Sequence, residues 1–120
     1  MKIRATIGIL AVAGVLPLSA VNPVTAAPRE TGLHHLHAAK RVGSKVCFIE
    51  HEHQGDGLAF PSRHVAEASA ARKWAAFTVD EYGSAWGSYA AANAKRMSCG
   101  QDGAKYWVCK ATARPCKVGR

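Results

Sequence analysis

Two histidines near the middle of the chain are the residues best placed to do chemistry. His51 and His53 are separated by one residue in the segment Glu50-His51-Glu52-His53. On a β-strand both imidazoles project from the same side, and this spacing can chelate Zn²⁺ or Cu²⁺. Because an H-x-H pattern is short and common, we favour a polar strand end in solvent and expect no cofactor. If a metal does bind, the completing ligand stays open among Asp56, His64, His34, His35 and His37.

The cysteines form a second set. An even number of cysteines in a short exported chain predicts two disulfides, and all three pairings remain open. Three of the four could project from one face of a sheet. The chain has no C-x-x-C motif, so structural bridges are favoured over thiol chemistry. The four residues are Cys47, Cys99, Cys109 and Cys116.

Positive charge is concentrated in residues 95–120. This segment carries seven Lys and Arg against Asp102 alone, whereas residues 27–94 carry seven of each sign. Outside the inner membrane the abundant polyanions are anionic lipid head groups and acidic polysaccharides, so nucleic acid is disfavoured as a partner. A solvated basic face without any partner is the alternative. The expected anion-binding residues are Arg96, Lys110, Arg114 and Lys117.

Motifs that accompany catalysis are missing from the sequence. It contains no G-x-S-x-G, no H-E-x-x-H and no phosphate-binding loop. A mature chain of about ninety residues also leaves little room for a substrate pocket. We therefore predict a protein that is not an enzyme.

Residues 1–26 have the organisation of a cleavable signal peptide. A short basic segment precedes an uncharged apolar run over residues 5–20, which is too short and, at Pro17, too broken to span a membrane. Val24-Thr25-Ala26 predicts cleavage after Ala26, with Ala20 as the alternative site. Export predicts a periplasmic or secreted protein in an oxidising compartment, where cysteines pair.

The first elements of the mature chain must position the histidines. Residues 27–44 have few large apolar side chains and predict a mobile leader that contains three histidines. Residues 45–53 are rich in β-formers and end in an alternating pattern, which predicts a strand. Gln54-Gly55-Asp56-Gly57 predicts a turn. A single small domain is expected over residues 45–120.

A long helix is expected next, followed by a second helical segment. Ser62 predicts the N-cap of a helix over residues 63–81, with Val65, Trp74 and Phe77 on one side. Gly83 breaks or kinks this helix, and residues 84–94 are again compatible with one. On a continuous helix, three aromatic residues would form one face toward the core: Tyr82, Trp86 and Tyr89.

The C-terminal part predicts a β-hairpin. Residues 96–99 and 105–112 are the two strands, and Gly100-Gln101-Asp102-Gly103 is the turn between them. The expected fold class is therefore α+β. A strand, one long or two short helices and a C-terminal hairpin would form a small antiparallel sheet stabilised by disulfides.

The second half of the chain also carries a recurring pattern. Trp74, Glu81-Tyr82-Gly83 and Trp86 precede a C-terminal part with Trp107-Val108-Cys109 and Ala113-Arg114-Pro115-Cys116. The arrangement resembles small uncharacterised exported proteins of rhizobia and related alphaproteobacteria, in which an aromatic helix precedes a W-x-C strand and a terminal A-x-P-C. The resemblance covers about the last fifty residues. It implies export and oxidised cysteines.

These features favour an exported, non-enzymatic protein that binds an anionic envelope component through its basic C-terminal hairpin. The first alternative is a histidine-based metal-binding periplasmic protein that uses His51 and His53. The second alternative is a small secreted modulator of another protein.

Overall fold

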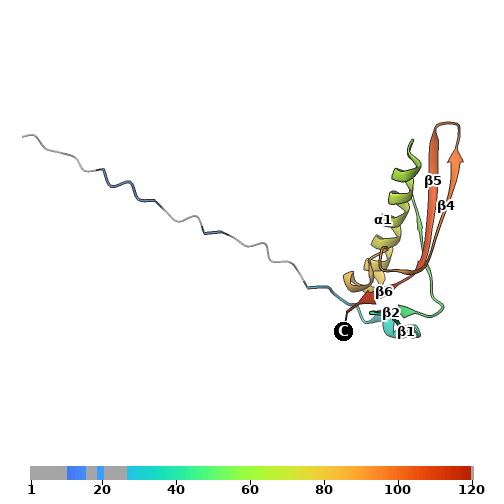
Figure 1. Cartoon of the computed structure of the whole chain (residues 1–120), viewed down its shortest axis with the longest axis horizontal. Coiled ribbons are helices and arrows are strands. Elements are labelled where there is room, and N and C mark those ends of the chain that lie inside the picture. The colour runs from blue at the N-terminus through green and yellow to red at the C-terminus, as the bar shows by residue number, and fades with distance from the viewer. Residues whose placement is uncertain (1–10, 16–18, 21–26, 120) are drawn as a thin grey trace, which may run out of the picture.

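The computed structural model of the chain describes residues 11–15, 19–20 and 27–119 (Figure 1). The expected signal peptide over residues 1–26 therefore lies largely outside the described residues. Residues 27–119 contain one α-helix, two short 3₁₀ turns and six strands. In chain order these are η1 (Leu33–Leu36), β1 (Ala39–Val42), β2 (Lys45–Phe48), β3 (His53–Asp56), α1 (Arg63–Tyr82), η2 (Ser84–Trp86), β4 (Asn93–Asp102), β5 (Tyr106–Arg114) and β6 (Cys116–Val118). Within the described ranges, no helix has both the length and the apolar character needed to cross a membrane.

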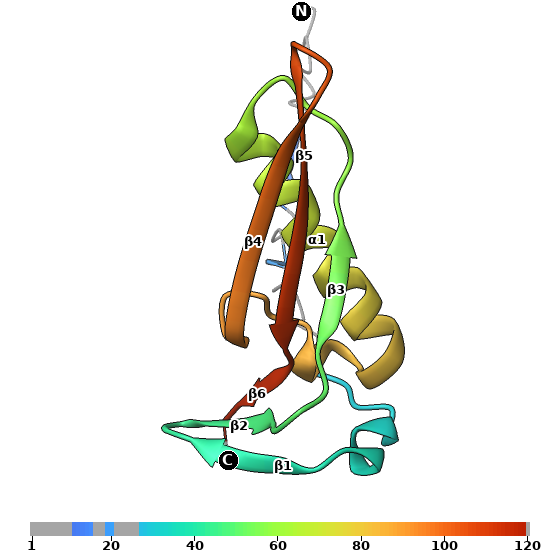
Figure 2. The same ribbon diagram turned by 90° about the vertical axis from the view of Figure 1, so that its right-hand side faces the viewer.

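The C-terminal hairpin is the centre of the larger sheet. β4 and β5 pair antiparallel, and β3 pairs with the other edge of β5, so the strand order is β3-β5-β4. Figure 2 shows this sheet in front of α1, which covers one of its faces. The α+β fold class and a C-terminal hairpin are confirmed. The turn predicted at residues 100–103 is displaced, because residues 100–102 extend β4 and the turn lies at residues 103–105.

Small side chains let α1 lie close to the sheet. Its buried positions recur mostly at every fourth residue, and they meet Ala111 and Ala113 of β5. Trp74 fills the centre of this contact, and its Nε1 donates a hydrogen bond of 3.2 Å to the Ala113 carbonyl oxygen. The buried residues of α1 are Ala66, Ser69, Ala70, Trp74, Thr78 and Tyr82.

The helix predicted over residues 63–81 is confirmed, but its buried side differs from the expected one. Val65 and Phe77 are 40% and 50% exposed, whereas Trp74 is fully buried. At about 100° per residue, nine positions place Val65 on the side of the helix opposite Trp74. The alanines, and not the bulky residues, therefore form the stripe that faces the sheet.

A second three-stranded sheet, with the order β1-β2-β6, lies at one end of the larger one (Figures 1 and 2). β1 belongs to residues 27–44, which the sequence predicts to be a mobile leader. Ala39 to Val42 pair antiparallel with Phe48 to Lys45 of β2. Part of the expected leader is therefore a strand of the fold.

The single strand expected over residues 45–53 is divided between the two sheets. β2 ends at Phe48 and β3 begins at His53, so residues 49–52 connect one sheet to the other. The turn predicted at 54–57 is also wrong, because residues 54–56 belong to β3. Gly55 serves close approach and not a turn: a Cβ atom there would collide with backbone atoms of Ala70 and Trp74.

α1 ends at Gly83, which has a φ of 96°, in the region that favours glycine. Residues preceding η1 then cap the helix. The Thr31 backbone N–H donates to the Tyr82 carbonyl oxygen at 3.1 Å, and the Thr31 hydroxyl donates to that of Glu81 at 2.6 Å. These bonds satisfy carbonyl groups that a helix end leaves without intrahelical partners.

The second helix expected over residues 84–94 does not form, since only η2 follows Gly83 and β4 begins at Asn93. The predicted aromatic face is therefore divided. Tyr82 and Trp86 are buried with Phe48 in one cluster, whereas Tyr89 contacts Trp74 in the other.

All four cysteines pair in cross-strand disulfides. Cys47–Cys116 joins β2 to β6, and Cys99–Cys109 joins β4 to β5, each with Cα atoms 4.1 Å apart. The expectation that Cys47 could share a sheet face with Cys99 and Cys109 is wrong, because Cys47 lies in the smaller sheet. Two disulfides fit an oxidising compartment.

Candidate metal centre

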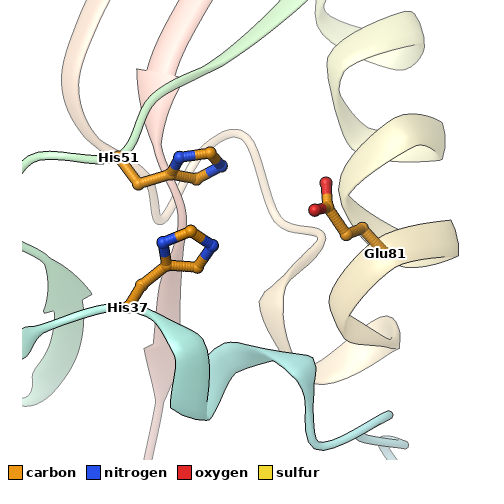
Figure 3. Close-up of side chains that lie close together, drawn as sticks. All are labelled: His37, His51 and Glu81. Carbon is orange, nitrogen blue, oxygen red and sulfur yellow. The ribbon is translucent and has the colours of Figure 1, made fainter.

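Three side chains from separate segments converge where α1 meets the smaller sheet. His37 lies between η1 and β1, His51 lies in the connection between β2 and β3, and Glu81 lies in the last turn of α1. One potential ligand atom from each lies within 4.8 Å of the others. Figure 3 shows that both imidazoles turn a nitrogen toward the Glu81 carboxylate. Two neutral imidazoles and a carboxylate are ligands that suit Zn²⁺ and Cu²⁺.

The two imidazoles are held in place by neighbouring rings. Those of His37 and His51 stack with centroids 4.0 Å apart and planes 17° apart. His37 Nε2 lies 2.8 Å from the Tyr82 hydroxyl. Burial and the nearby Glu81 carboxylate raise the pKa of Tyr82, so the hydroxyl keeps its proton at neutral pH. His37 therefore presents a fixed edge to the cluster.

His51 carries the clearest sign of a missing partner. Its Nε2 atom is buried and has no hydrogen-bond partner among the described residues. Burial, and secondarily the neighbouring His37, lower the pKa of His51 below its ordinary value, which favours the neutral ring. Since buried polar atoms are nearly always hydrogen-bonded, this nitrogen is available to bind a ligand.

A solvent-filled hollow lies beside His37 and His51. A hollow of about 400 Å³ is lined by residues 36–38 together with Glu50 and His51. The hollow therefore borders both imidazoles, whereas the Nε2 atom of His51 is itself buried.

His53 lies behind Glu81, in the core. Its side chain is 1% exposed, its Nδ1 lies 2.9 Å from the Thr78 hydroxyl, and its Nε2 lies 3.0 Å from Glu81 Oε2. The ring stacks on Tyr82 with centroids 5.0 Å apart. Burial lowers the pKa of His53 to about 4, against the opposing attraction of Glu81, so the ring is neutral at pH 7.

The metal pair expected from sequence is only partly reproduced. His51 and His53 have ring centroids 5.0 Å apart with planes at 79°, because the strand begins at His53 and His51 precedes it. Of the possible completing ligands, His37 joins His51. The others lie elsewhere: Asp56 hydrogen-bonds to Gln54, His64 is exposed on α1, and His34 and His35 contact each other near Trp86.

Glu81 is the residue that sequence reasoning missed. It follows the histidine pair by about thirty positions and lies at the end of a different element, so no local spacing relates it to them. Its only signal is its place in the final helical turn before Gly83, next to the aromatic Tyr82.

The basic residues expected to bind anions are mostly paired with carboxylates. Arg96 contacts Glu52 at 2.7 Å and lowers the pKa of that carboxyl, and Arg114 lies 3.7 Å from the same residue. Lys117 contacts Glu30 at 2.6 Å, in the smaller sheet. Lys110 is exposed and lies opposite Asp56 in the strand register. The net charge of the C-terminal segment is thus offset locally.

Comparisons with protein-family models, with curated proteins and with solved structures find no match for this chain.

Proposed function

We propose that this chain is an exported, non-enzymatic metal-binding protein that holds a Zn²⁺ or Cu²⁺ ion between His37, His51 and Glu81. The observation that carries the proposal is the convergence of three ligand groups from three separate segments, within 4.8 Å. The Nε2 atom of His51, which has no hydrogen-bond partner among the described residues, supports it, as does the hollow beside His37 and His51. The two disulfides and the expected signal peptide fit a protein of the periplasm or the exterior.

Anion binding by the C-terminal hairpin ranks below metal binding. The strand register places Arg96, Lys110 and Arg114 on the sheet face away from α1, which favours a shared surface. Glu52 and Asp56, however, lie beside these residues and reduce the attraction for an anionic lipid or polysaccharide. In the metal cluster, by contrast, the Nε2 atom of His51 has no hydrogen-bond partner among the residues that the structure describes.

The direct test is calorimetric titration of the oxidised protein at pH 7 with Zn²⁺ and, separately, with Cu²⁺. We expect one ion per chain. His51→Gln should weaken the affinity by more than about 100-fold, beyond the loss that changes around a metal's ligands cause. His64→Gln, which changes an exposed histidine at the other end of α1, is the matched control and should bind as the parent does. The proposal is overturned if the parent protein does not bind, or if both variants bind equally well.

A further inference from the structure

The outer edge of β4 is the longest open strand edge in the described part of the chain. β4 has ten residues and pairs on one side only, with β5, because it ends the strand order β3-β5-β4. The other edge strands, β1, β3 and β6, have three or four residues each. Figure 2 shows β4 along one side of the sheet, with α1 behind the sheet. An open edge of this length is a template for pairing with another strand.

The backbone groups that face this edge belong to alternate residues of β4. Cys99 and Cys109 have Cα atoms 4.1 Å apart, which is the spacing of an antiparallel pair that exchanges no backbone hydrogen bonds. Cys109 and Trp107 of β5 make backbone hydrogen bonds of 2.7 to 3.0 Å on the side away from β4, and their partners there are Gly57 and Phe60. Their opposite residues on β4, Cys99 and Gln101, therefore turn their own N–H and carbonyl groups toward the open edge.

Most of this edge lacks the features that prevent strand pairing. A register shift between Asn93 and Arg96 and the charge of Lys95 interrupt only its first residues. Residues 97–101 contain no proline and no charged side chain, and their pairing with β5 is regular. By the same alternation, Met97 joins Cys99 and Gln101 in offering an N–H and a carbonyl group to a second strand.

We propose that two copies of this chain associate edge to edge through β4, antiparallel and about a two-fold axis at Cys99. A dimer of this symmetry joins the two larger sheets into one continuous sheet. Met97, Cys99 and Gln101 then lie opposite Gln101, Cys99 and Met97 of the second copy, which satisfies all their outward-facing backbone groups. The inference goes beyond metal binding and does not rest on it.

Charge complementarity selects both the second copy as the partner and this register. Arg96 and Asp102 lie near opposite ends of β4, at alternate positions whose side chains point away from α1. Of the registers that the backbone alternation allows, only the one centred on Cys99 places Arg96 directly opposite Asp102 of the second copy, and symmetry repeats the pair. The Arg96 side chain is 64% exposed and gives two hydrogen bonds to Glu52, so N–H donors of its guanidinium remain for Asp102.

Sedimentation velocity of the oxidised protein at pH 7, over a range of concentrations and with a chelator present, tests the dimer without any bound metal. We expect a reversible equilibrium between monomer and dimer. Arg96→Asp and Asp102→Arg should each weaken dimerisation by about 10-fold or more, because like charges then meet at both symmetry-related pairs. An equimolar mixture of these two variants should associate again, since opposite charges meet in the mixed dimer.

Two variants on α1 are the matched controls. Arg72→Asp and Asp80→Arg make the same changes of charge at exposed positions far from β4 in the sequence, and they should dimerise as the parent does. The proposal is overturned if the parent stays monomeric at every concentration, or if the mixture of the Arg96→Asp and Asp102→Arg proteins does not associate.

Hydrogen exchange of the parent protein, followed residue by residue by nuclear magnetic resonance, identifies the surface that forms the dimer. The N–H groups of Met97, Cys99 and Gln101 should exchange quickly at low concentration and become protected as the dimer forms. Those of Ser98 and Gly100 face β5 and should be protected at both concentrations. A dimer that leaves Met97, Cys99 and Gln101 unprotected uses a different surface and overturns the pairing through β4.

Discussion

Two buried regions of this molecule differ in the side chains that fill them. The helix–sheet core, formed by α1 against β5, contains mostly alanine around a single Trp74, whose Nε1 is hydrogen-bonded. The aromatic–histidine cluster at the end of α1 contains ring side chains in mutual contact: His37, Phe48, His51, His53, Tyr82 and Trp86.

The regions differ most in how their buried polar atoms are satisfied. In the aromatic–histidine cluster the ring nitrogens His51 Nε2, His53 Nε2 and Trp86 Nε1 make no hydrogen bonds within the described part of the chain. Buried polar atoms without partners destabilise a fold by about 1–3 kcal/mol each. In a small domain, such atoms are expected at sites that bind a ligand. The aromatic–histidine cluster therefore lowers the stability of the fold, and the helix–sheet core has to compensate for it.

The largest expected effects are the losses of unfolding free energy when either disulfide is removed, because each disulfide lies in or beside one of the two regions. Cys47–Cys116 closes 69 positions beside the aromatic–histidine cluster, and Cys99–Cys109 closes 10 positions in the hairpin. By loop-closure entropy, paired Cys→Ala changes should lower the free energy of unfolding by about 4 kcal/mol at the first bridge and about 3 kcal/mol at the second. Urea denaturation of the two double variants measures both values.

The comparison of the two regions depends on which double variant loses more free energy of unfolding. A greater loss at Cys99–Cys109 would mean that the smaller sheet is held by its own contacts and does not depend on its cross-link. The prediction also requires the first double variant to lose Zn²⁺ affinity, because β2 leads directly to His51, while the second variant keeps it.

Acid sensitivity should arise from the aromatic–histidine cluster. The pKa of His53 is about 4 in the folded protein and about 6.5 in the unfolded chain, so the unfolded chain binds the extra proton between these values. Stability is therefore complete above pH 6.5 and falls by up to about 3 kcal/mol as the pH drops to about 4. Unfolding free energies of the metal-free protein across this range test the prediction.

His53→Gln separates this effect from other acid-sensitive groups. The variant should lose the decline between pH 6.5 and 4 but keep a further decline at lower pH. Arg96 holds the pKa of Glu52 below its ordinary value, and that stabilisation is lost only as Glu52 is protonated. An unchanged profile in His53→Gln would assign the sensitivity to a different residue.

The same contrast explains what the sequence could predict. The helix over residues 63–81 and the hairpin depend on local signals, namely the Ser62 cap and the Asp-Gly pair, and both elements form, although the turn lies at residues 103–105 and not at 100–103. The division of residues 45–53 between two sheets follows from pairing with β5 and β6, which are distant in sequence, so no local pattern reveals it. Only part of the site could be predicted for the same reason. The H-x-H pattern indicates His51, whereas Glu81 lies beside it only because of the tertiary fold.

The smallest expected effect compares the two most buried tryptophans. Trp74 and Trp86 are 0% and 1% exposed, so replacing either by Phe removes a similar apolar volume. Trp74→Phe also deletes the hydrogen bond to the Ala113 carbonyl oxygen. Trp86→Phe instead deletes a buried N–H that has no acceptor among the residues that the structure describes.

Trp74→Phe should therefore lower the free energy of unfolding by about 2 kcal/mol more than Trp86→Phe, because one change removes a hydrogen bond and the other removes an unsatisfied donor. Urea denaturation of the two single variants at pH 7 measures the difference. The Phe ring at position 86 can keep the stack on Phe48, now 4.8 Å between centroids, so the comparison isolates the polar atom. Equal losses would show that Trp86 Nε1 is as well satisfied as Trp74 Nε1. The aromatic–histidine cluster would then differ from the helix–sheet core only in its histidines, which the metal titrations examine directly.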